Sequence, residues 1–479
     1  MNVIFRIDAS EKIGNGHVER CLHLAKYFSK KNIEIIIIYR KMFEIQLNEF
    51  KKISSNIYKI SHKSKDLSET IRFIKSHTKP DLLIVDNYEI DYKWELIVKK
   101  YVKKLFVIDD FANKKHHCDF YLNQNFLKFD NLKINRDCIP MLGTNYSIIK
   151  DEIKKQRKLT KKKYHSLDNI FICFGGIDYQ NYTSTTLKAL IPFLPHFKEI
   201  NVICSINNPN ITQLKKIINK YKKIKLHISP EDFSNILSKS DFAIGACGVL
   251  NNERMFLGIP SLIFGISENQ NKIAENLIDG AYVLGNPKFY KPDIKVIQSW
   301  VDLILNNKFL LSNLSKKSKT LIDGEGIRRI YDVINSQNYE FKPVTLEYCE
   351  ILFDWRNHKI NRSASFSSNK LVYNDHKKWL MQKLRDKNCI FRMVTHGEKN
   401  CGTVRFDCIN EIAIISIYKN PSVKFAPNLI VSSVHWLSVN YKHIKEVQAN
   451  ILSSNLRSIK AFKKAGFAIY NSTYKKKIR

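Results

Sequence analysis

The chain has 479 residues, and its 79 Lys and Arg outnumber its 45 Asp and Glu to give a formal net charge of +34. A chain of this length exceeds a single core and predicts about three domains, which excludes a small disulfide-stapled scaffold. Hydrophobic residues make up 44% and charged residues 26% of the chain, so its composition is that of a globular protein rather than of a disordered polymer.

The positive charge favours an anionic partner such as nucleic acid, an anionic lipid or a phosphorylated small molecule. However, Lys, Asn and Ile are frequent along the whole chain, and no block of five or six uninterrupted basic residues occurs. We therefore attribute most of the charge to compositional background. Neither nucleic acid nor a membrane is expected as a partner.

Cysteine spacing and the absence of a targeting pattern predict a cytoplasmic protein. The ten Cys are scattered without a Cys-x-x-Cys pair, which predicts neither a disulfide framework nor a metal site. The longest nearly apolar run, residues 33–39, is far shorter than the roughly 20 residues that cross a bilayer. The first residues follow a strand pattern and not that of a signal peptide.

Residues 1–150 alternate short apolar runs with helical stretches. The runs "NVIFRID", "IEIIIIYR", "DLLIVDNY" and "KLFVIDD" are typical of strands, and "HVERCLHLAKYFSKK" has helical periodicity. Fully apolar strands separated by helices indicate a parallel sheet that is covered on both faces. This region is therefore predicted to form a Rossmann-like lobe, and the basic stretch that follows it is predicted to be a surface connection.

Residues 151–335 repeat the pattern, with strand-like runs "NIFICFGG", "EINVICS", "IKLHIS", "SDFAIGACG" and "PSLIFGI" between helical stretches. Two doubly wound lobes in tandem place a ligand in the cleft between them, at the carboxyl ends of their strands. Residues 343–479 change to an α+β pattern with hairpin-like runs such as "CIFRMVTHG" and "NCGTVRFD". The predicted fold is thus α/β, with two Rossmann-like lobes followed by a third, α+β domain.

The loop after the first strand, "DASEKIGNGHVER", has the features of an anion-binding site. Gly14 and Gly16 let backbone amides approach a ligand at the N-terminus of the next helix. Glu19 occupies the third glycine position of G-x-G-x-x-G, so a dinucleotide site is not predicted. His17 lies at the positive end of the helix, which would keep its imidazole neutral and able to accept a proton from water. The alternative is a helix-capping histidine without a chemical role.

Three loops in the second lobe have a related pattern. Gly175 and Gly176 separate a strand from a helix, and Gly245 and Gly248 precede a helix that carries Glu253. A carboxylate on the first turn of such a helix can accept hydrogen bonds from both hydroxyls of a ribose, while the loop amides hold the attached phosphates.

The third loop places Asn269 and Gln270 before another helix, where their amides can bind sugar hydroxyls or N-acetyl groups. For every residue in these loops the alternative is a helix cap or a solvated helix face. The recurrence of such loops at three strand ends favours a binding site.

Residues 1–335 resemble the UDP-sugar hydrolases of pseudaminic acid biosynthesis. The resemblance rests on "FRIDASEKIGNGHVERCLHLA", "VDNYEID", "IDDFANKKHHCDFYLNQN", "ICFGGIDYQNYT" and "ERMFLGIP" followed by "ENQ", and its most specific part is Gly-x-Gly-His-x-x-Arg. It implies a glycosyltransferase B fold. It also implies hydrolysis of UDP-2,4-diacetamido-2,4,6-trideoxy-β-L-altropyranose to UDP and free sugar, by attack of water at the anomeric carbon and without a metal.

The resemblance also implies roles for individual residues. His17 would be the base that activates water. The substrate-binding residues would be Gly14, Gly16, Arg20, Tyr88, Gly175, Gly176, Gly248, Glu253, Asn269 and Gln270.

The sequence departs from the family at four positions. Val249 and Leu250 replace the usual small hydroxyl residues, which leaves backbone amides and Asn251 or Asn252 to bind phosphate. Lys114 and Lys150 also stand where arginine is usual, which removes a bidentate contact.

The third domain resembles the GNAT-type N-acetyltransferases through its "NLRSIKAFKKAGF" motif, and "WRNH" and "DHKKWL" are similar to the nucleotide-sugar acetyltransferases of the same pathway. This implies acetyl-CoA as the cofactor, bound by Asn455, Ser458 and Lys424. Pro427 lies in a segment without the usual glycines, and Phe462 replaces a tyrosine that would protonate the leaving thiolate.

We therefore expect a bifunctional nucleotide-sugar enzyme, with UDP-sugar and acetyl-CoA as its ligands. One alternative is a UDP-sugar-dependent glycosyltransferase with a degenerate acetyltransferase-like domain. Another is a nucleic-acid-binding protein driven by the positive charge. The oligomeric state and the stereochemistry of the sugar stay open at this point.

Overall fold

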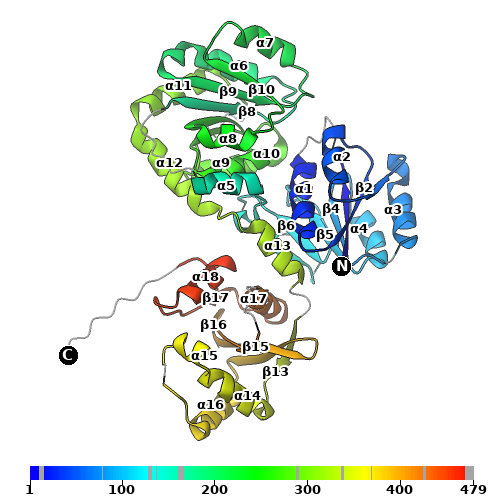
Figure 1. Ribbon diagram of the computed structural model, residues 1–479, viewed down its shortest axis with the longest axis vertical. Helices are drawn as coiled ribbons and strands as arrows, with labels where there is room; N and C mark the ends of the chain where they lie inside the picture. Colours follow the sequence, from blue (N-terminus) through cyan, green and yellow to red (C-terminus); the bar gives the residue numbers. More distant parts are fainter. Residues whose placement is uncertain are drawn as a thin grey trace, which may run out of the picture. The chain divides into compact units, whose positions relative to one another are not determined.

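The structure is a computed structural model that describes residues 1–9, 16–77, 79–127, 132–135, 137–159, 167–286, 291–335, 339–367, 369–423 and 428–469. The chain divides into two compact units, residues 1–327 and 328–479 (Figure 1). We describe each unit by itself.

The first unit begins with a seven-stranded parallel sheet in the order β3-β2-β1-β4-β5-β6-β7. Its strands are β1 (Asn2–Ile7), β2 (Glu34–Tyr39), β3 (Asn56–Lys59), β4 (Leu82–Asp86), β5 (Lys104–Ile108), β6 (Phe120–Asn123) and β7 (Ile139–Leu142). Its helices are α1 (Gly16–Ser29), α2 (Glu44–Lys51), α3 (Asp66–Lys75) and α4 (Tyr92–Val98).

The strand order of this sheet determines where a ligand can bind. The chain runs outward from β1 to β3 and then returns to β4 on the other side of β1. Loops therefore diverge from the carboxyl ends of β1 and β4, which leaves a crevice at this switch point. The central strands β1 and β4 are buried almost along their whole length, as their continuous apolar sequences predict.

A second parallel sheet, in the order β10-β9-β8-β11-β12, follows in the same unit. Its strands are β8 (Asn169–Cys173), β9 (Glu199–Cys204), β10 (Ile224–Ile228), β11 (Phe242–Ala246) and β12 (Ser261–Phe264). Its helices are α5 (Asp151–Leu159), α6 (Tyr182–Leu190), α7 (Ile211–Ile218), α8 (Phe233–Lys239), α9 (Val249–Leu257), α10 (Glu268–Asp279), α11 (Ile294–Asn306) and α12 (Lys308–Leu321).

Helices cover both faces of this second sheet, with α6 and α11 on one side and α8 and α9 on the other (Figure 1). Two apolar clusters, one on each face, form its core. Its switch point lies between β8 and β11. The predicted α/β class with two parallel-sheet lobes is confirmed.

The second unit is an α+β domain that begins within α13 (Gly326–Asn335). Its strands β13 (Glu340–Pro343), β14 (Cys389–His396), β15 (Lys399–Ile409), β16 (Ile412–Lys419) and β17 (Glu446–Gln448) pair in this order. Its further helices are α14 (Cys349–Asn357), α15 (Lys359–Ser363), α16 (Tyr373–Arg385), α17 (Asn428–Asn440) and α18 (Leu456–Lys464).

The last strand pair of the second unit differs from the others in direction and length. The pairs from β13 to β16 are antiparallel, whereas β16 and β17 are parallel and pair over three residues at the start of β16. Beyond Ile414, β16 continues without pairing to β17, which ends at Gln448. As for membrane insertion, none of the helices in the described ranges combines the length and the apolar character of a bilayer span.

Candidate functional site

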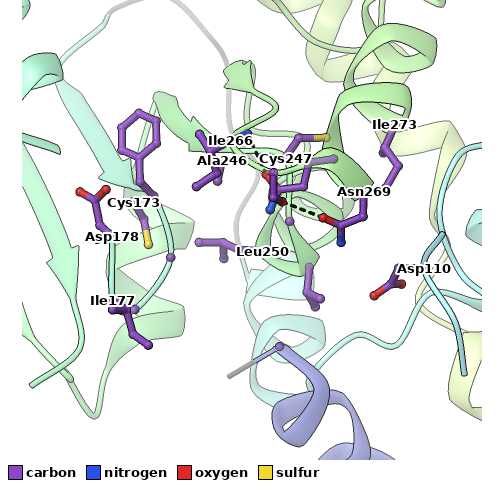
Figure 2. A pocket seen from close by; sticks show the side chains of 18 of the residues that line it. Asp110, Cys173, Ile177, Asp178, Ala246, Cys247, Leu250, Ile266, Asn269 and Ile273 are labelled. Carbon is purple, nitrogen blue, oxygen red and sulfur yellow. Dashed lines mark hydrogen bonds between the residues drawn. The ribbon is translucent and has the colours of Figure 1, made fainter. Parts of the chain in front are cut away.

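A cavity of about 710 Å³ lies between the two lobes of the first unit, at the carboxyl ends of both sheets. The first lobe contributes residues from α1 and from the loops after β4 and β5, and the second lobe contributes the loops after β8, β11 and β12. Figure 2 shows Asp110 on one side of this space and Cys173, Ile177 and Asp178 on the other, with Leu250 and Asn269 between them. The volume is in the range of small-molecule sites.

His17 enters the cavity from the first turn of α1, which starts at Gly16. Its Nδ1 contacts the Oδ1 of Asp86, the last residue of β4, and both side chains are buried. A carboxylate only accepts hydrogen bonds, so Nδ1 carries a proton, and in the neutral imidazole Nε2 is then the nitrogen with the free lone pair. The Nη2 of Arg20 lies 3.3 Å from Nδ1, but a guanidinium cannot accept that proton, which leaves Asp86 as the partner.

Arg20 does not line the cavity. It lies behind the cavity wall and holds the carboxylates of Asp86 and Asp110. It donates Nε and Nη2 to Asp86 at 2.5 and 2.7 Å, and Nη1 to both oxygens of Asp110 at 2.8 Å. Burial acts to raise the pKa of Asp86, but Arg20 and His17 outweigh it and hold that pKa well below its ordinary value. Asp86 is therefore ionised and orients the imidazole.

Tyr88 joins this network from the loop after β4. Its hydroxyl donates to Asp110 at 2.6 Å, and its ring meets the His17 ring edge-on at a centroid distance of 4.2 Å. Burial and the negative charge of Asp110 raise the pKa of Tyr88 well above its ordinary value, so the hydroxyl keeps its proton. Asn269 of the second lobe donates Nδ2 to the same hydroxyl at 3.5 Å, which links the two lobes across the cavity.

Among the helix N-termini that face the cavity, those of α6 and α9 differ in what they offer a ligand. At α6 the Asp178 carboxylate accepts from the backbone N–H groups of Tyr182 and Thr183 at 2.9 and 2.8 Å. At α9 the N-cap residue is Gly248, and no side chain caps the helix. Because the α9 amides are open, this helix is the better seat for a phosphate.

Glu253 lies on the cavity side of α9 with a buried carboxylate. Its Oε1 has no hydrogen-bond partner in the described part of the chain, and the nearest cation, Lys150 Nζ, is 4.0 Å away. Burial raises the pKa of Glu253, although Lys150 opposes the shift. An unsatisfied buried acceptor at the wall of a cavity calls for a donor from the ligand, and a pair of vicinal hydroxyls supplies two.

Two of the four departures from the hydrolase pattern, Val249 and Leu250, lie at the start of α9. Val249 and Leu250 line the cavity, whereas Asn251 and Asn252 do not. The expectation that Asn251 or Asn252 binds phosphate is therefore wrong, because they lie on the opposite face of α9 from Leu250 and Glu253. Asn251 is buried and accepts a hydrogen bond from Arg254 instead.

The two lysines that stand at usual arginine positions have different surroundings. Lys150 lines the cavity between Glu19 and Glu253, at 3.6 and 4.0 Å from their carboxylates. Burial acts to lower the pKa of Lys150, but Glu253 and Glu19 outweigh it and raise that pKa. Lys114 does not line the cavity and donates Nζ to the backbone carbonyl of Tyr88 at 2.8 Å.

The cavity brings together most of the residues that the sequence singles out for this unit. The predicted residues that line it are Gly16, His17, Tyr88, Gly175, Gly176, Gly248, Glu253, Asn269 and Gln270. Arg20 acts behind the wall, and Gly14 lies outside the described residues. Their roles in binding or catalysis stay predictions.

Three residues of the site escaped the sequence analysis: Asp86, Asp110 and Asn125, which donates to Asp110 at 2.9 Å. Each follows or ends a buried strand, where "IVD", "VIDD" and "LNQN" place polar groups after apolar runs. Polar residues at the carboxyl ends of parallel strands are the signal that would have found them. Among the described residues, no group of three or more His, Cys, Asp and Glu side chains is arranged to hold a metal ion.

In the second unit, Asn455 caps α18 by accepting from the Ser458 amide at 3.1 Å, and it donates Nδ2 to the Ala364 carbonyl at 3.1 Å. Phe462 packs against Phe467, with ring centroids 5.0 Å apart. Lys424 and Pro427 lie outside the described residues. Binding of acetyl-CoA by Asn455 and Ser458 stays a prediction.

Similarity to known proteins is clearest for the first unit. The chain is 29% identical over 285 residues to the UDP-2,4-diacetamido-2,4,6-trideoxy-beta-L-altropyranose hydrolase of Campylobacter jejuni, which covers 59% of this chain and 98% of that protein. It is 25% identical over 494 residues to the uncharacterized protein MJ1062 of Methanocaldococcus jannaschii, which covers 98% of this chain and 96% of that protein. No protein-family model matches.

Among solved structures, the chain is similar to MurG of Acinetobacter baumannii, with a TM-score of 0.51, 14% identity, and coverage of 70% of this chain and 99% of that one. At this identity the likeness concerns the fold alone. Together with the two parallel sheets, it shows that the chain contains the glycosyltransferase B fold that the resemblance predicts.

Proposed function

We propose that the first unit hydrolyses a UDP-linked diacetamido-trideoxyhexose to UDP and free sugar, a step of pseudaminic acid biosynthesis. The single observation that carries this proposal is His17, whose Nδ1 is held by Asp86 so that Nε2 is left with its lone pair at the cavity. The hydrolase of C. jejuni, to which the chain is similar, supports the choice of a UDP-sugar as substrate.

In the proposed reaction, His17 Nε2 takes a proton from a water molecule as the water oxygen attacks the anomeric carbon. The bond between this carbon and the diphosphate oxygen breaks, and its electron pair leaves with UDP. Asp86 stabilises the imidazolium that forms, and Arg20 keeps Asp86 ionised in the buried site. Tyr88, which keeps its proton, can hold the sugar or the water beside His17.

The second lobe would bind the nucleotide. The open amides at the N-terminus of α9 suit the diphosphate, whose negative charge grows as the bond breaks. Glu253 suits the ribose hydroxyls, because its Oε1 lacks a hydrogen-bond partner among the described residues. Asn269 contacts Tyr88 and suits the acetamido groups of the sugar, and Gln270 lines the cavity beside Gly248, where its amide suits the sugar or the diphosphate.

For the second unit we propose N-acetylation by acetyl-CoA of the 4-amino group of the UDP-sugar in the preceding step. Support comes from the short parallel pairing of β16 with β17, since the part of β16 beyond Ile414 keeps no β17 partner and an extended cofactor could lie along it. The substrate amine would attack the thioester directly, forming the amide and releasing the thiol of coenzyme A. The similarity to MJ1062 extends over both units.

One assay tests both steps. The purified chain is given the UDP-4-amino-sugar with and without acetyl-CoA, and the products are followed by NMR. We expect the acetylated UDP-sugar and then UDP with free sugar only when acetyl-CoA is present. A His17→Ala chain should still acetylate and should bind UDP nearly as before, but its UDP release should fall by about 100-fold or more. Unchanged turnover in this variant contradicts the assignment of His17.

A second candidate function, transfer of the sugar to an acceptor, is favoured by the glycosyltransferase B fold. The two candidates differ in what happens when the acetylated UDP-sugar is given without any acceptor. A hydrolase releases free sugar at the rate at which UDP appears, whereas a transferase releases little of either. Rate enhancement by an added sugar acceptor would support transfer.

A further inference from the structure

Arg254 is a fully buried arginine on α9, and the nearby charge of Glu253 acts on it without a direct contact. Its Nη2 donates to the backbone carbonyl of Ala246 at 2.5 Å and to Asn251 Oδ1 at 3.3 Å, while Nε and Nη1 have no hydrogen-bond partner among the described residues. No carboxylate of the described residues forms an ion pair with it. Burial lowers its pKa to about 10, so the side chain still carries a positive charge at neutral pH.

Arg6 and Arg20 are the other two fully buried arginines among the described residues of this unit, and both form ion pairs with carboxylates. Arg6 contacts the carboxylates of Asp8 and Asp66, and Arg20 contacts two carboxylates in the catalytic network. A buried charge without a counter-charge destabilises a fold, and proteins usually satisfy such charges with a carboxylate or a ligand. Among the described residues, no carboxylate contacts Arg254 directly, and only the charge of Glu253 acts on it from nearby, so an anion in the cavity would add the counter-charge that direct contacts give Arg6 and Arg20.

The guanidinium lies directly behind the loop that forms the cavity wall. Ala246, whose carbonyl it holds, lines the cavity together with Cys247 and Gly248 (Figure 2). Gly245 makes room for it, because a Cβ at this position would come within 2.9 Å of Arg254 Nη1 and 2.0 Å of the Cys173 carbonyl oxygen. The positive charge of Arg254 therefore lies close to the N-terminus of α9, where no side chain caps the helix.

We propose that Arg254 is a positioning residue for the diphosphate of a nucleoside diphosphate, which it attracts by its charge and through the loop that it holds, without touching the ligand. This inference rests on the proposed binding of UDP in the cavity. A fixed charge that is shielded from water acts more strongly than one in solvent. It also favours bond cleavage, because the charge on the departing UDP increases in the transition state.

The test compares the wild type with Arg254→Met, which removes the charge at similar volume. Calorimetry measures the affinities of UDP and of uridine, thermal unfolding gives Tm without ligand, and UDP release gives kcat and KM. We expect UDP affinity to fall by about tenfold or more with uridine affinity unchanged. We also expect kcat to fall. The ligand-free Tm serves to compare the folds, because the variant loses both a buried charge and the hydrogen bonds to Ala246 and Asn251.

Arg6→Met is the matched control, since it removes an equally buried arginine that has two carboxylate partners. It should lower Tm and leave the ratio of UDP to uridine affinity unchanged. Arg254→Lys keeps a charge at the site and should retain most of that ratio.

Equal losses of UDP and uridine affinity in Arg254→Met would overturn the assignment of Arg254. A wild type that binds UDP no better than uridine would overturn it as well. By contrast, a wild type that prefers UDP but releases no free sugar contradicts the proposed hydrolysis alone, and the affinity ratio still decides the role of Arg254.

Discussion

At the scale of single residues, the pair of Asp86 and His17 determines what the cavity can do. An imidazole has two nitrogens, and only the contact with Asp86 determines which of them faces the ligand with a lone pair. Arg20, on the same helix as His17, adds a bidentate contact to the Asp86 carboxylate at the end of β4. The carboxylate is thereby fixed as the acceptor of the proton on His17 Nδ1. Asp86 is therefore a positioning residue for His17.

Asp86→Asn should lower kcat by about 100- to 10,000-fold, with UDP affinity changed much less. The amide can donate to Nδ1, which would favour the tautomer that has its proton on Nε2 and cannot act as a base. Steady-state UDP release and calorimetry with UDP measure the two effects. Asp66→Asn is the control, because Asp66 pairs with buried Arg6 away from the cavity and its loss should affect Tm but not kcat. Equal kcat in the Asp86 and Asp66 variants would contradict this role.

At the scale of elements, the N-termini of α6 and α9 look alike in sequence and differ in the structure. Both follow a glycine-containing loop after a buried strand, and Gly175 has a φ of +93° that favours glycine. Yet the α6 amides are occupied by Asp178, and those of α9 are open. Asp178 therefore caps α6 from within the protein, whereas the first amides of α9 are available to a ligand.

Asp178→Ala should lower the free energy of unfolding of the first unit by about 1 kcal/mol, because the amides of Tyr182 and Thr183 lose their acceptor. UDP affinity should not decrease, since the variant removes a negative charge from the cavity wall and leaves α9 unchanged. Denaturant unfolding and calorimetry provide the two measurements. Asp178→Asn is a milder control, because asparagine accepts one such bond and tolerates the positive φ of 41° at this position. A loss of UDP affinity in Asp178→Ala would indicate that α6 binds the diphosphate.

At the scale of the whole molecule, a second buried network supports the loop that carries Asp110. His116 Nδ1 contacts Glu95 Oε1 at 2.7 Å, and its Nε2 lies 3.7 Å from Asp109. Asp109 in turn accepts from the backbone amides of Phe111 and Ala112. Burial acts to lower the pKa of His116, but Asp109 and Glu95 outweigh it and raise the pKa from 6.5 to about 9.

This shift predicts a pH dependence of stability. Folded His116 keeps its proton up to about pH 9 and the unfolded chain loses it near 6.5, so the stabilisation is complete below pH 6.5 and is lost as pH rises through 9. It amounts to about 3 kcal/mol. Denaturant midpoints from pH 6 to 9.5 should fall for the wild type and change less for His116→Gln. If the midpoints of the wild type and of His116→Gln fall equally with pH, the pH dependence arises from another group and not from His116.

How far the fold can be read from the sequence depends on burial and periodicity. The runs around β1, β4, β8 and β11 are apolar because both faces of each sheet are covered, and this local signal predicts two parallel-sheet lobes. Glycines at strand ends and His17 in its motif are likewise visible in the sequence. Asn251 and Asn252 were misjudged because their face on α9 depends on how that helix packs.

The sequence by itself determined the two lobes, the α+β domain after them and nine of the residues that line the cavity, because these depend on local patterns and on strand ends that a parallel sheet brings together. Only the tertiary structure decided which side chains share protons and charges. Asp86 contacts His17 from 69 residues away in the chain, so no local pattern reveals this pair. The atoms of Arg254 and Glu253 that lack hydrogen-bond partners among the described residues are likewise known only from the distances and the burial that the packed elements create.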